Sequence, residues 1–534
     1  MKINKFLAGV LATLSIAACS DIENVFPESS TVLASQVVEI NSIKPERAKA
    51  SFNGLFTHLG TPWKGKYEKP DDFQFLMMMF CNDLEGADAW IPDSGYNWFS
   101  VCGELSSRNA NYRNPYIRYQ TPYGLIADVN IFLSGLDKET QDPLIINMMA
   151  QARALRAYAY LMQAPQFQFV TKKDAPCIPI VTEETTDFTN NPRATVQQVY
   201  DLIFTDLNYA IENLEGATRT SKMQIDQNVA YGLRARANLD MQNYAEAATD
   251  AEKAAAGYTP AMITAPAFMS LSETNWLWGF DCTSDMTVGD RAYSTPSSWL
   301  RSFSGNGYSP ACAVYSCINN ILYDKIPSTD VRKGWWVDEN LESPLIKDLL
   351  WSNGQPVAIA DDGGDSKLPF IPYTNVKFGC LTIGTTTNDE DFPFMRVEEM
   401  ILIQAEGYAK SGNEGKAKQI LNDFVKTYRD PAYDCDATGL SLADEIWKQR
   451  RIELWGEGFG ALDIKRLGKP LVRFHDDKSS FPDAFRFNLS NDDGWMLMRF
   501  PQGEMNTNFG IIDNSDGHIP SMGQNAELKD GVTD

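Results

Sequence analysis

Apolar residues recur every three or four positions along much of the chain, a pattern typical of amphipathic α-helices. Residues 147–162 combine strong helix formers with one face that carries Leu155, Tyr158 and Met162. A second period follows Ala194-Thr195, with apolar residues at 199, 202, 203, 207, 210, 211 and 214. We therefore predict helices over about 45–65, 110–165, 195–257 and 394–458.

Two of these segments repeat one pattern, in which a helix, a turn and a second helix follow each other. A small residue on the first helix is followed at equal spacing by one on the second: Ala235 and Ala247 in one segment, Ala405 and Ala417 in the other. Facing alanines let two helices approach closely, which is how tetratricopeptide hairpins pack. The sequence predicts a mainly α fold that contains two such hairpins.

The segment between the hairpins, 271–390, has a different texture. Turn-forming glycine, proline, serine and aspartate dominate it, with tryptophans, tyrosines and cysteines between them. A loop region this long is usually functional or a lobe of its own. We predict one domain over 45–534, with helical parts at 45–270 and 391–470. The loop-rich lobe at 271–390 would hold few short strands, and an irregular segment would follow at 471–534.

The amino terminus has the layout of an export signal. Two lysines in Met1–Lys5 precede the apolar run Phe6–Ala18, which is shorter than the ~20 apolar residues that span a bilayer. Ile16-Ala-Ala-Cys19 resembles the lipobox of bacterial lipoproteins, in which the cysteine is acylated after cleavage. We predict a signal peptide at 1–18, an acylated Cys19 and a polar tether at 19–44. The alternative is an ordinary signal peptide with an accidental cysteine.

Charge and residue usage argue against several functions. Lys and Arg number 47 against 70 Asp and Glu, and the resulting net charge of −23 repels nucleic acid. The three histidines, His58, His475 and His518, lie far apart in sequence, which argues against a zinc site and against His-based catalysis. The cysteines after Cys19 are scattered, so we expect buried thiols and leave one or two disulfides open.

The strongest of several motifs along the chain covers Arg450–Gly458 with Leu462, Asp463 and Arg466. It resembles ERRxELxxEGxRxxDLxR, a motif of the SusD/RagB family of outer-membrane glycan-binding lipoproteins. Gln449 replaces the usual Glu there, and Gly460 stands where Arg is common. The other similar segments, in chain order, are Glu23–Pro27, Tyr116–Asn130, Ala152–Leu161, Asp330–Arg332, Arg396–Glu406 and Phe500–Asn506.

The resemblance implies a non-enzymatic protein, anchored in the outer membrane through Cys19 and exposed at the cell surface. It would capture oligosaccharides as a lid over its partner, a SusC-like TonB-dependent transporter. A RagB-like peptide receptor is one alternative, and a surface glycoside hydrolase using a carboxylate pair such as Asp83 with Asp88 is another. We expect no cofactor, although acidic turns such as Asp361–Asp365 leave a structural calcium ion open.

Four charged residues near the strongest motif are candidates for acid–base chemistry. They are Arg450, Glu453, Glu457 and Arg466. Their helical spacing predicts ion pairs with each other instead. We interpret them as structural support.

A sugar ring presents flat C–H faces that stack on aromatic rings, while its hydroxyl groups need polar partners. Exposed Trp or Tyr beside Asn, Asp or Arg therefore indicates a candidate site, and two irregular stretches fit. We predict Tyr96, Asn97 and Trp98 as the main contacts, because Ser94 and Gly95 place them in a turn. Further predicted contacts are Trp90 in the same stretch, and Tyr293, Trp299, Tyr308 and Tyr315 in the lobe. Trp276, Trp278, Trp335 and Trp336 have apolar neighbours and are expected in the core.

Overall fold

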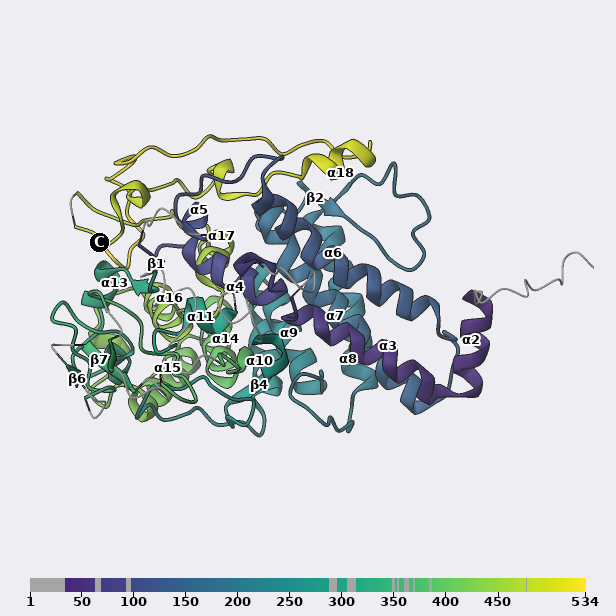
Figure 1. Cartoon of the computed structure of the whole chain (residues 1–534), viewed down its shortest axis with the longest axis horizontal. Coiled ribbons are helices and arrows are strands. Elements are labelled where there is room, and N and C mark those ends of the chain that lie inside the picture. The colour runs from purple at the N-terminus through teal and green to yellow at the C-terminus, as the bar shows by residue number, and fades with distance from the viewer. Residues whose placement is uncertain are drawn as a thin grey trace, which may run out of the picture.

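The structure is a computed structural model that describes residues 34–62, 69–92, 98–287, 295–304, 314–347, 351–352, 355–359, 365–367, 370–383, 387–476 and 478–534. Figure 1 shows long helices in one half of the molecule and the loop-rich lobe, with β6 and β7, at the opposite end. Helix α2 lies at one end of the long axis and the carboxyl terminus lies toward the other.

Helices dominate the described residues, so the prediction of a mainly α fold is confirmed. They are α2 (Ala34–Ile43), α3 (Ala48–Leu55), α4 (Gln74–Leu84), α5 (Ser100–Gly103), α6 (Arg113–Ser134), α7 (Pro143–Phe167), α8 (Val196–Asn213), α9 (Gln227–Asp240), α10 (Tyr244–Ala255), α11 (Pro296–Leu300), α13 (Asn320–Asp324), α14 (Val397–Lys410), α15 (Glu414–Tyr428), α16 (Leu442–Glu453), α17 (Gly460–Leu467) and α18 (Gln502–Thr507).

The strands are short and pair in antiparallel fashion. The pairs are β1 (Ala89–Trp90) with β5 (Cys317–Ile318), β2 (Pro176–Pro179) with β3 (Arg193–Thr195), and β4 (Trp276–Phe280) with β9 (Phe392–Arg396). A three-stranded sheet contains β6 (Trp351–Ser352), β7 (Gln355–Ile359) and β8 (Asp365–Lys367). The sequence predicted a lobe with few and short strands, as observed here.

Side-chain caps divide the long predicted helices into shorter ones. The Asp142 carboxylate accepts from the N–H groups of Leu144 and Ile145 and begins α7, and Pro143 fits the first helical position. Thr195 and Gln198 form a reciprocal capping box at the start of α8. The stretch 110–165 therefore contains the two helices α6 and α7, which pack against each other.

Part of the predicted tether is helical, which corrects the 19–44 boundary. Residues 34–43 form α2. The Asn41 amide donates to the carbonyl of Gly135 at the end of α6, 2.9 Å away, and Val37 packs against the same glycine. A contact with a residue 94 positions away could not be found from the local pattern.

The two tetratricopeptide-like hairpins are present as α9–α10 and α14–α15. All four matched alanines are fully buried. The turns that join the two helices of each hairpin also match. Gln242 in the first turn and Gly412 in the second both have a positive φ, of 60° and 90°. The asparagine that follows each of them donates its N–H to a carbonyl five residues earlier. Helix α10 also packs against α14, so the hairpins are neighbours in space.

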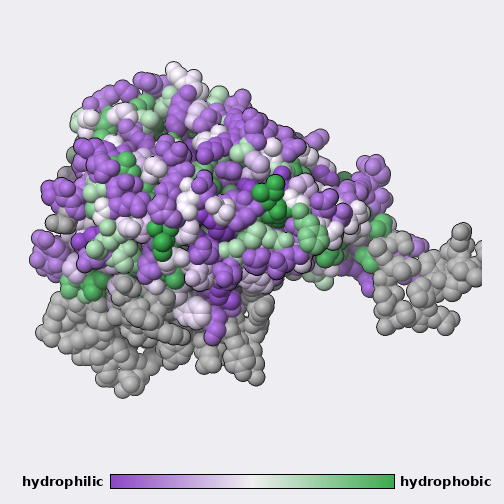
Figure 2. Space-filling model, turned by 90° about the horizontal axis from the view of Figure 1, so that it is seen from above, coloured by the Kyte–Doolittle hydropathy of each residue, from purple (hydrophilic) through white to green (hydrophobic). Residues whose placement is uncertain are grey.

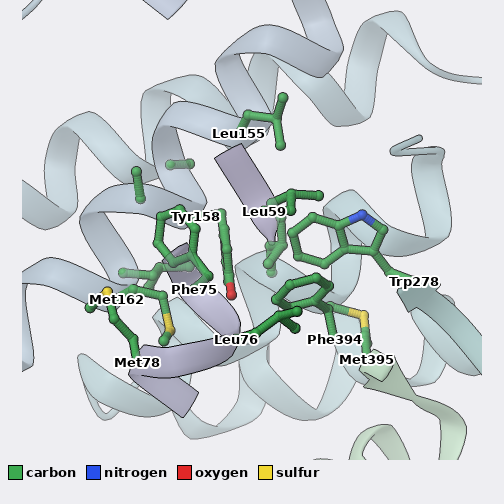
Figure 3. Close-up of a cluster of buried hydrophobic side chains, with 14 of the residues drawn as sticks. Leu59, Phe75, Leu76, Met78, Leu155, Tyr158, Met162, Trp278, Phe394 and Met395 are labelled. Atoms are coloured by element: carbon green, nitrogen blue, oxygen red, sulfur yellow. The ribbon is translucent and has the colours of Figure 1, made fainter. Parts of the chain in front are cut away.

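The lobe leaves and rejoins the helical body through one strand pair. In β4–β9, Trp276 is opposite Arg396 and Phe280 is opposite Phe392. The Trp278 ring lies 4.8 Å from Tyr158 of α7 and 4.9 Å from Phe394 of β9, in the buried cluster of Figure 3. Burial of Trp276, Trp278, Trp335 and Trp336 confirms their assignment to the core.

The described cysteines are reduced, and the face of the molecule in Figure 2 is mainly polar. The seven cysteines in the described ranges are all buried free thiols. Across those ranges no helix combines the length and apolarity needed to cross a membrane. On the face shown in Figure 2, hydrophilic residues dominate and hydrophobic ones are scattered.

Candidate functional site

The structure describes four of the eight predicted ligand contacts. Tyr96, Asn97, Tyr293 and Tyr308 lie outside the described residues, as do Cys19 and residues 361–364 of the acidic turn. Trp98 is half-buried. Trp90, Trp299 and Tyr315 are 8%, 1% and 0% exposed.

The expectation that Trp90, Trp299 and Tyr315 expose their rings is wrong. Trp90 lies in β1, and its indole N–H donates to the carbonyl of Ile318 at 3.0 Å. Trp299 packs against other aromatic rings, and Tyr315 packs 5.5 Å from the ring of Phe370. Partners from distant segments cover all three rings, so a sugar could not stack on them in this conformation.

Trp98 borders a cleft of about 340 Å³. Its walls come from the 3₁₀ turn Pro70–Asp72, from α4 and α5, and from the start of α6. The lining residues are Asp71, Cys81, Trp98, Phe99, Val101, Cys102, Ser107, Arg113, Asn114 and Ile117. This volume lies within the range of small-ligand sites, roughly 300–1,000 Å³.

One wall of the cleft carries a charged pair. Arg113 Nε and Nη2 donate to the two Asp71 carboxylate oxygens at 2.8 and 2.9 Å, and Arg113 also pairs with Asp72. Burial raises the pKa of Asp71, and the Arg113 guanidinium opposes that rise. The hydrogen bond to Asp71 raises the pKa of Arg113, whose side chain is 42% exposed. A planar donor group therefore faces solvent in a fixed orientation.

The interior of the cleft is less polar. The Asn114 amide lies 3.9 Å from the Cys102 sulfur, and its oxygen accepts from Arg118. Burial, together with a hydrogen bond to the Cys102 thiol, raises the pKa of Cys81 well above its ordinary value. The Cys81 thiol therefore stays neutral at physiological pH and acts as a small apolar group.

The loop-rich lobe supports the cleft from behind. Phe99 lines the cleft, and its ring lies 4.9 Å from Phe80 of α4 and 5.2 Å from Trp299 of α11. Trp299 in turn lies 4.5 Å from Phe80. The lobe residue predicted as a ligand contact thus packs behind a ring that lines the cleft.

Sequence reasoning missed the polar residues of this cleft, namely Asp71, Ser107, Arg113 and Asn114. Asp71 and Arg113 are 42 positions apart, and only the packing of the Pro70–Asp72 turn against α6 brings them together. The one local signal was the polar pair Arg113-Asn114 just before the aromatic segment of α6.

An aromatic ring beside a fixed guanidinium–carboxylate pair can bind a polar ligand with a flat apolar face.

The carboxylate pair considered for hydrolysis is arranged differently. Asp83 accepts from the N–H groups of Gly458 and Gly460 at 2.8 and 2.9 Å, and both Asp88 oxygens accept from Arg451. Both carboxylates line a void of only about 20 Å³. Such a void holds one water molecule and no sugar ring.

The four charged residues near the strongest motif form buried ion pairs, but with partners other than those predicted. Glu453 binds Arg332, Arg396 and Arg429, whereas Glu457 binds Arg396 and Lys377. Arg450 and Arg466 both bind Asp463, and Arg466 also binds Glu406. The prediction that they pair with each other is wrong, because side chains from other segments are in reach.

The two departures from the motif also have structural partners. The Gln449 oxygen accepts from Arg332, and its amide donates to Glu445. At Gly460, an added Cβ would lie 3.2 Å from an Asp83 carboxylate oxygen. Glycine thus leaves room for the bond between its own N–H and Asp83.

Helical hairpins joined to a loop-rich lobe define a tetratricopeptide-like architecture, and the Trp98 cleft is its candidate ligand site. Two family models match the chain: "Starch-binding associating with outer membrane" over residues 61–239 and "SusD family" over residues 371–518. The chain belongs to the SusD/RagB family. No curated protein matches it.

Solved structures share the fold over most of the chain. A SusD-like carbohydrate-binding protein from Bacteroides vulgatus has a TM-score of 0.71 and 23% identity, covering 88% of this chain and 97% of its own. Surface glycan-binding protein A from Bacteroides thetaiotaomicron, in complex with laminarihexaose, has a TM-score of 0.65 and 15% identity, covering 88% and 99%. A laminarin-binding SusD-like protein has a TM-score of 0.60 and 16% identity, with the same coverage.

Proposed function

We propose that the protein binds oligosaccharides at the Trp98 cleft and delivers them to a SusC-like TonB-dependent transporter. It acts as a lipoprotein of the outer membrane, held at the cell surface by acylated Cys19. The function needs no catalytic step, because the ligand is captured and passed on. The observation that carries the proposal is the half-buried Trp98 beside the Asp71–Arg113 pair in a cleft of about 340 Å³.

The chemistry of the cleft suits a sugar. The half-buried indole of Trp98 offers an apolar face for C–H groups, and the Lys69 ammonium lies 5.6 Å from its ring centroid. Arg113 provides hydrogen-bond donors, and Asp71 provides acceptors that keep their orientation through the ion pair. Sugar hydroxyl groups both donate and accept, so they can use both partners at once.

The relatives suggest which sugars to test first. One structural relative was solved with laminarihexaose, and another is a laminarin-binding protein. Laminarihexaose therefore comes first, followed by malto-, cello-, xylo- and mannohexaose. A panel is needed because the cleft residues do not by themselves specify one linkage.

The Trp98→Ala variant tests the proposal. Isothermal titration with the tightest-binding hexaose should show an affinity loss of about 1–3 kcal/mol, the scale measured for bases stacked on aromatic rings. The control is Phe188→Ala, which removes an aromatic ring that is 58% exposed in a loop outside the cleft. That variant should bind like the wild type.

Several results would contradict the proposal. Unchanged affinity in a folded Trp98→Ala protein would place the ligand elsewhere. Binding to a peptide array without binding to any glycan would favour a RagB-like receptor. Release of reducing sugar by the wild-type protein would favour a hydrolase.

A further inference from the structure

A second and larger groove, of about 880 Å³, lies in the loop-rich lobe. Helix α13, the 3₁₀ helix Val331–Trp335 and the turn 338–347 form its walls. In Figure 1, α13 lies in the part of the molecule opposite α2. The groove shares no lining residue with the Trp98 cleft. Its volume is in the upper part of the range for small-ligand sites, roughly 300–1,000 Å³.

The rim of the groove has a fixed backbone. One Asp338 carboxylate oxygen accepts from the N–H groups of Asn340 and Glu342 at 2.8 and 2.9 Å. The Ser343 hydroxyl donates to the carbonyl of Gly334 at 2.6 Å, which joins the turn to the helix beneath it. Leu341, between these bonds, has a φ of 67°, a strained value for a branched side chain. The groove is therefore shaped before any ligand arrives.

Two buried aromatic residues support one wall of the groove from behind. The Tyr323 ring borders the groove and is held between Tyr373, whose ring centroid is 5.4 Å away, and the Lys333 ammonium at 4.7 Å. Trp336 also lines the groove, and its buried Nε1 has no hydrogen-bond partner among the residues that the structure describes. A buried indole N–H without an acceptor is unusual, and a water molecule or a ligand is the kind of group that satisfies it.

The charges around the groove cancel. Arg332 neutralises Asp330 at 2.6 Å, which leaves Asp338 and Glu342 against Lys333 and Lys347. This balance contrasts with a net charge of −23 for the whole chain. The rim also presents exposed Ser328, Thr329 and Asn340. A balanced, hydroxyl- and amide-rich rim suits a neutral polar ligand.

We propose that this groove is a second carbohydrate-binding site, which takes a neutral oligosaccharide independently of the Trp98 cleft. The ligand class rests on the proposed function, whereas the existence of a second site rests on the groove itself. Two separated sites would let the protein hold one long glycan at two points, which raises its apparent affinity for polymers over short oligosaccharides.

Fluorine NMR of protein labelled with 5-fluorotryptophan tests the two sites separately. The fluorine signals of Trp98 and Trp336 are identified as those that disappear in the Trp98→Phe and Trp336→Phe variants. The labelled protein is titrated with laminari-, malto-, cello-, xylo- and mannohexaose. At least one hexaose should shift the Trp336 signal, and the same shift should occur in the Trp98→Ala protein.

A blocking variant identifies the groove as the cause. Thr329→Arg places a long side chain at the rim and should weaken the response of Trp336 about tenfold or more. Thr218→Arg, the same change at an exposed threonine outside the groove, should have no effect. A response that persists unchanged in Thr329→Arg would overturn the proposal.

The outcomes separate this proposal from the proposed function. A silent Trp336 signal with all five hexaoses at millimolar concentration overturns the second site, whatever Trp98 does. A Trp336 response together with a silent Trp98 signal supports the groove and removes the proposed site at Trp98.

Discussion

Asp83 illustrates how burial changes the chemistry of a single residue. Hydrogen bonds from the N–H groups of Gly458 and Gly460 favour its ionised form, but burial outweighs them and raises its pKa from 3.8 to about 7. Between about pH 4 and pH 7 the folded state therefore binds a proton that the unfolded chain has released. The contribution of Asp83 to stability is highest below pH 4 and falls as the pH rises through this window.

The Asp83→Asn variant should change that dependence. Without the ionisable group, the variant should gain stability relative to the wild type as the pH rises from 4 to 7, by about 1.4 kcal/mol for each pKa unit of the shift at most. Urea unfolding at a series of pH values measures the difference. The control is Asp423→Asn, at an exposed position. Its free energy of unfolding should differ from that of the wild type by the same amount at every pH. If the free energy of unfolding had the same pH dependence in the wild type and in Asp83→Asn, the raised pKa of Asp83 would be contradicted.

At the scale of elements, the close approach of α10 and α14 holds the two hairpins together. Gly407 makes it possible, because a Cβ there would lie 2.5 Å from the carbonyl oxygen of Tyr244 and 2.8 Å from Cβ of Ala248. Both atoms belong to α10, and one is backbone, so neither can move without moving the helix. The helix α15 also contains a glycine, Gly415, but a Cβ at this position would meet nothing within 4 Å.

These two glycines give a matched pair of variants. Gly407→Ala should lower the free energy of unfolding by about 1–3 kcal/mol, because the added methyl group overpacks the interface. Gly415→Ala should raise it by about 0.5–1 kcal/mol, because alanine loses less backbone entropy in a helix. Denaturant unfolding of both variants measures the difference. Equal stability would mean that α10 and α14 can separate at little cost.

At the scale of the whole molecule, the proposed attachment to the membrane depends on residues that precede helix α2. Helix α2 begins at Ala34, so residues 20–33 separate it from Cys19. Two or three acyl chains on that cysteine would give a stable anchor, at ~0.8 kcal/mol per buried methylene. The negative charge of the chain gives no attraction to anionic lipids, so the anchor would act without electrostatic help.

Cys19→Ala should release the protein into the periplasm. In cells grown with an alkyne-labelled fatty acid, the wild-type protein should carry the label and sediment with the outer membrane, and the variant should do neither. Ser20→Ala, one residue further on, should behave like the wild type. A labelled Cys19→Ala protein would rule out acylation at this residue.

Local sequence patterns predicted the mainly α fold, the two hairpins and the resemblance to the family. Helical period, the helix start at Ala194-Thr195 and the matched alanines are signals carried within a few residues of each other, so no tertiary information is needed to find them. The burial of Trp276, Trp278, Trp335 and Trp336 also followed from their apolar neighbours along the chain.

Which side chains meet depends on how distant segments pack against each other. Glu453 binds Arg332 and Arg429 instead of its helical neighbours, and Asp71 meets Arg113 across 42 positions. The exposure of an aromatic ring is likewise set by distant segments, which is why Trp299 is buried although its local sequence resembles a surface loop. Local patterns specify which elements form, and the packing of those elements against each other places charges and rings at a site.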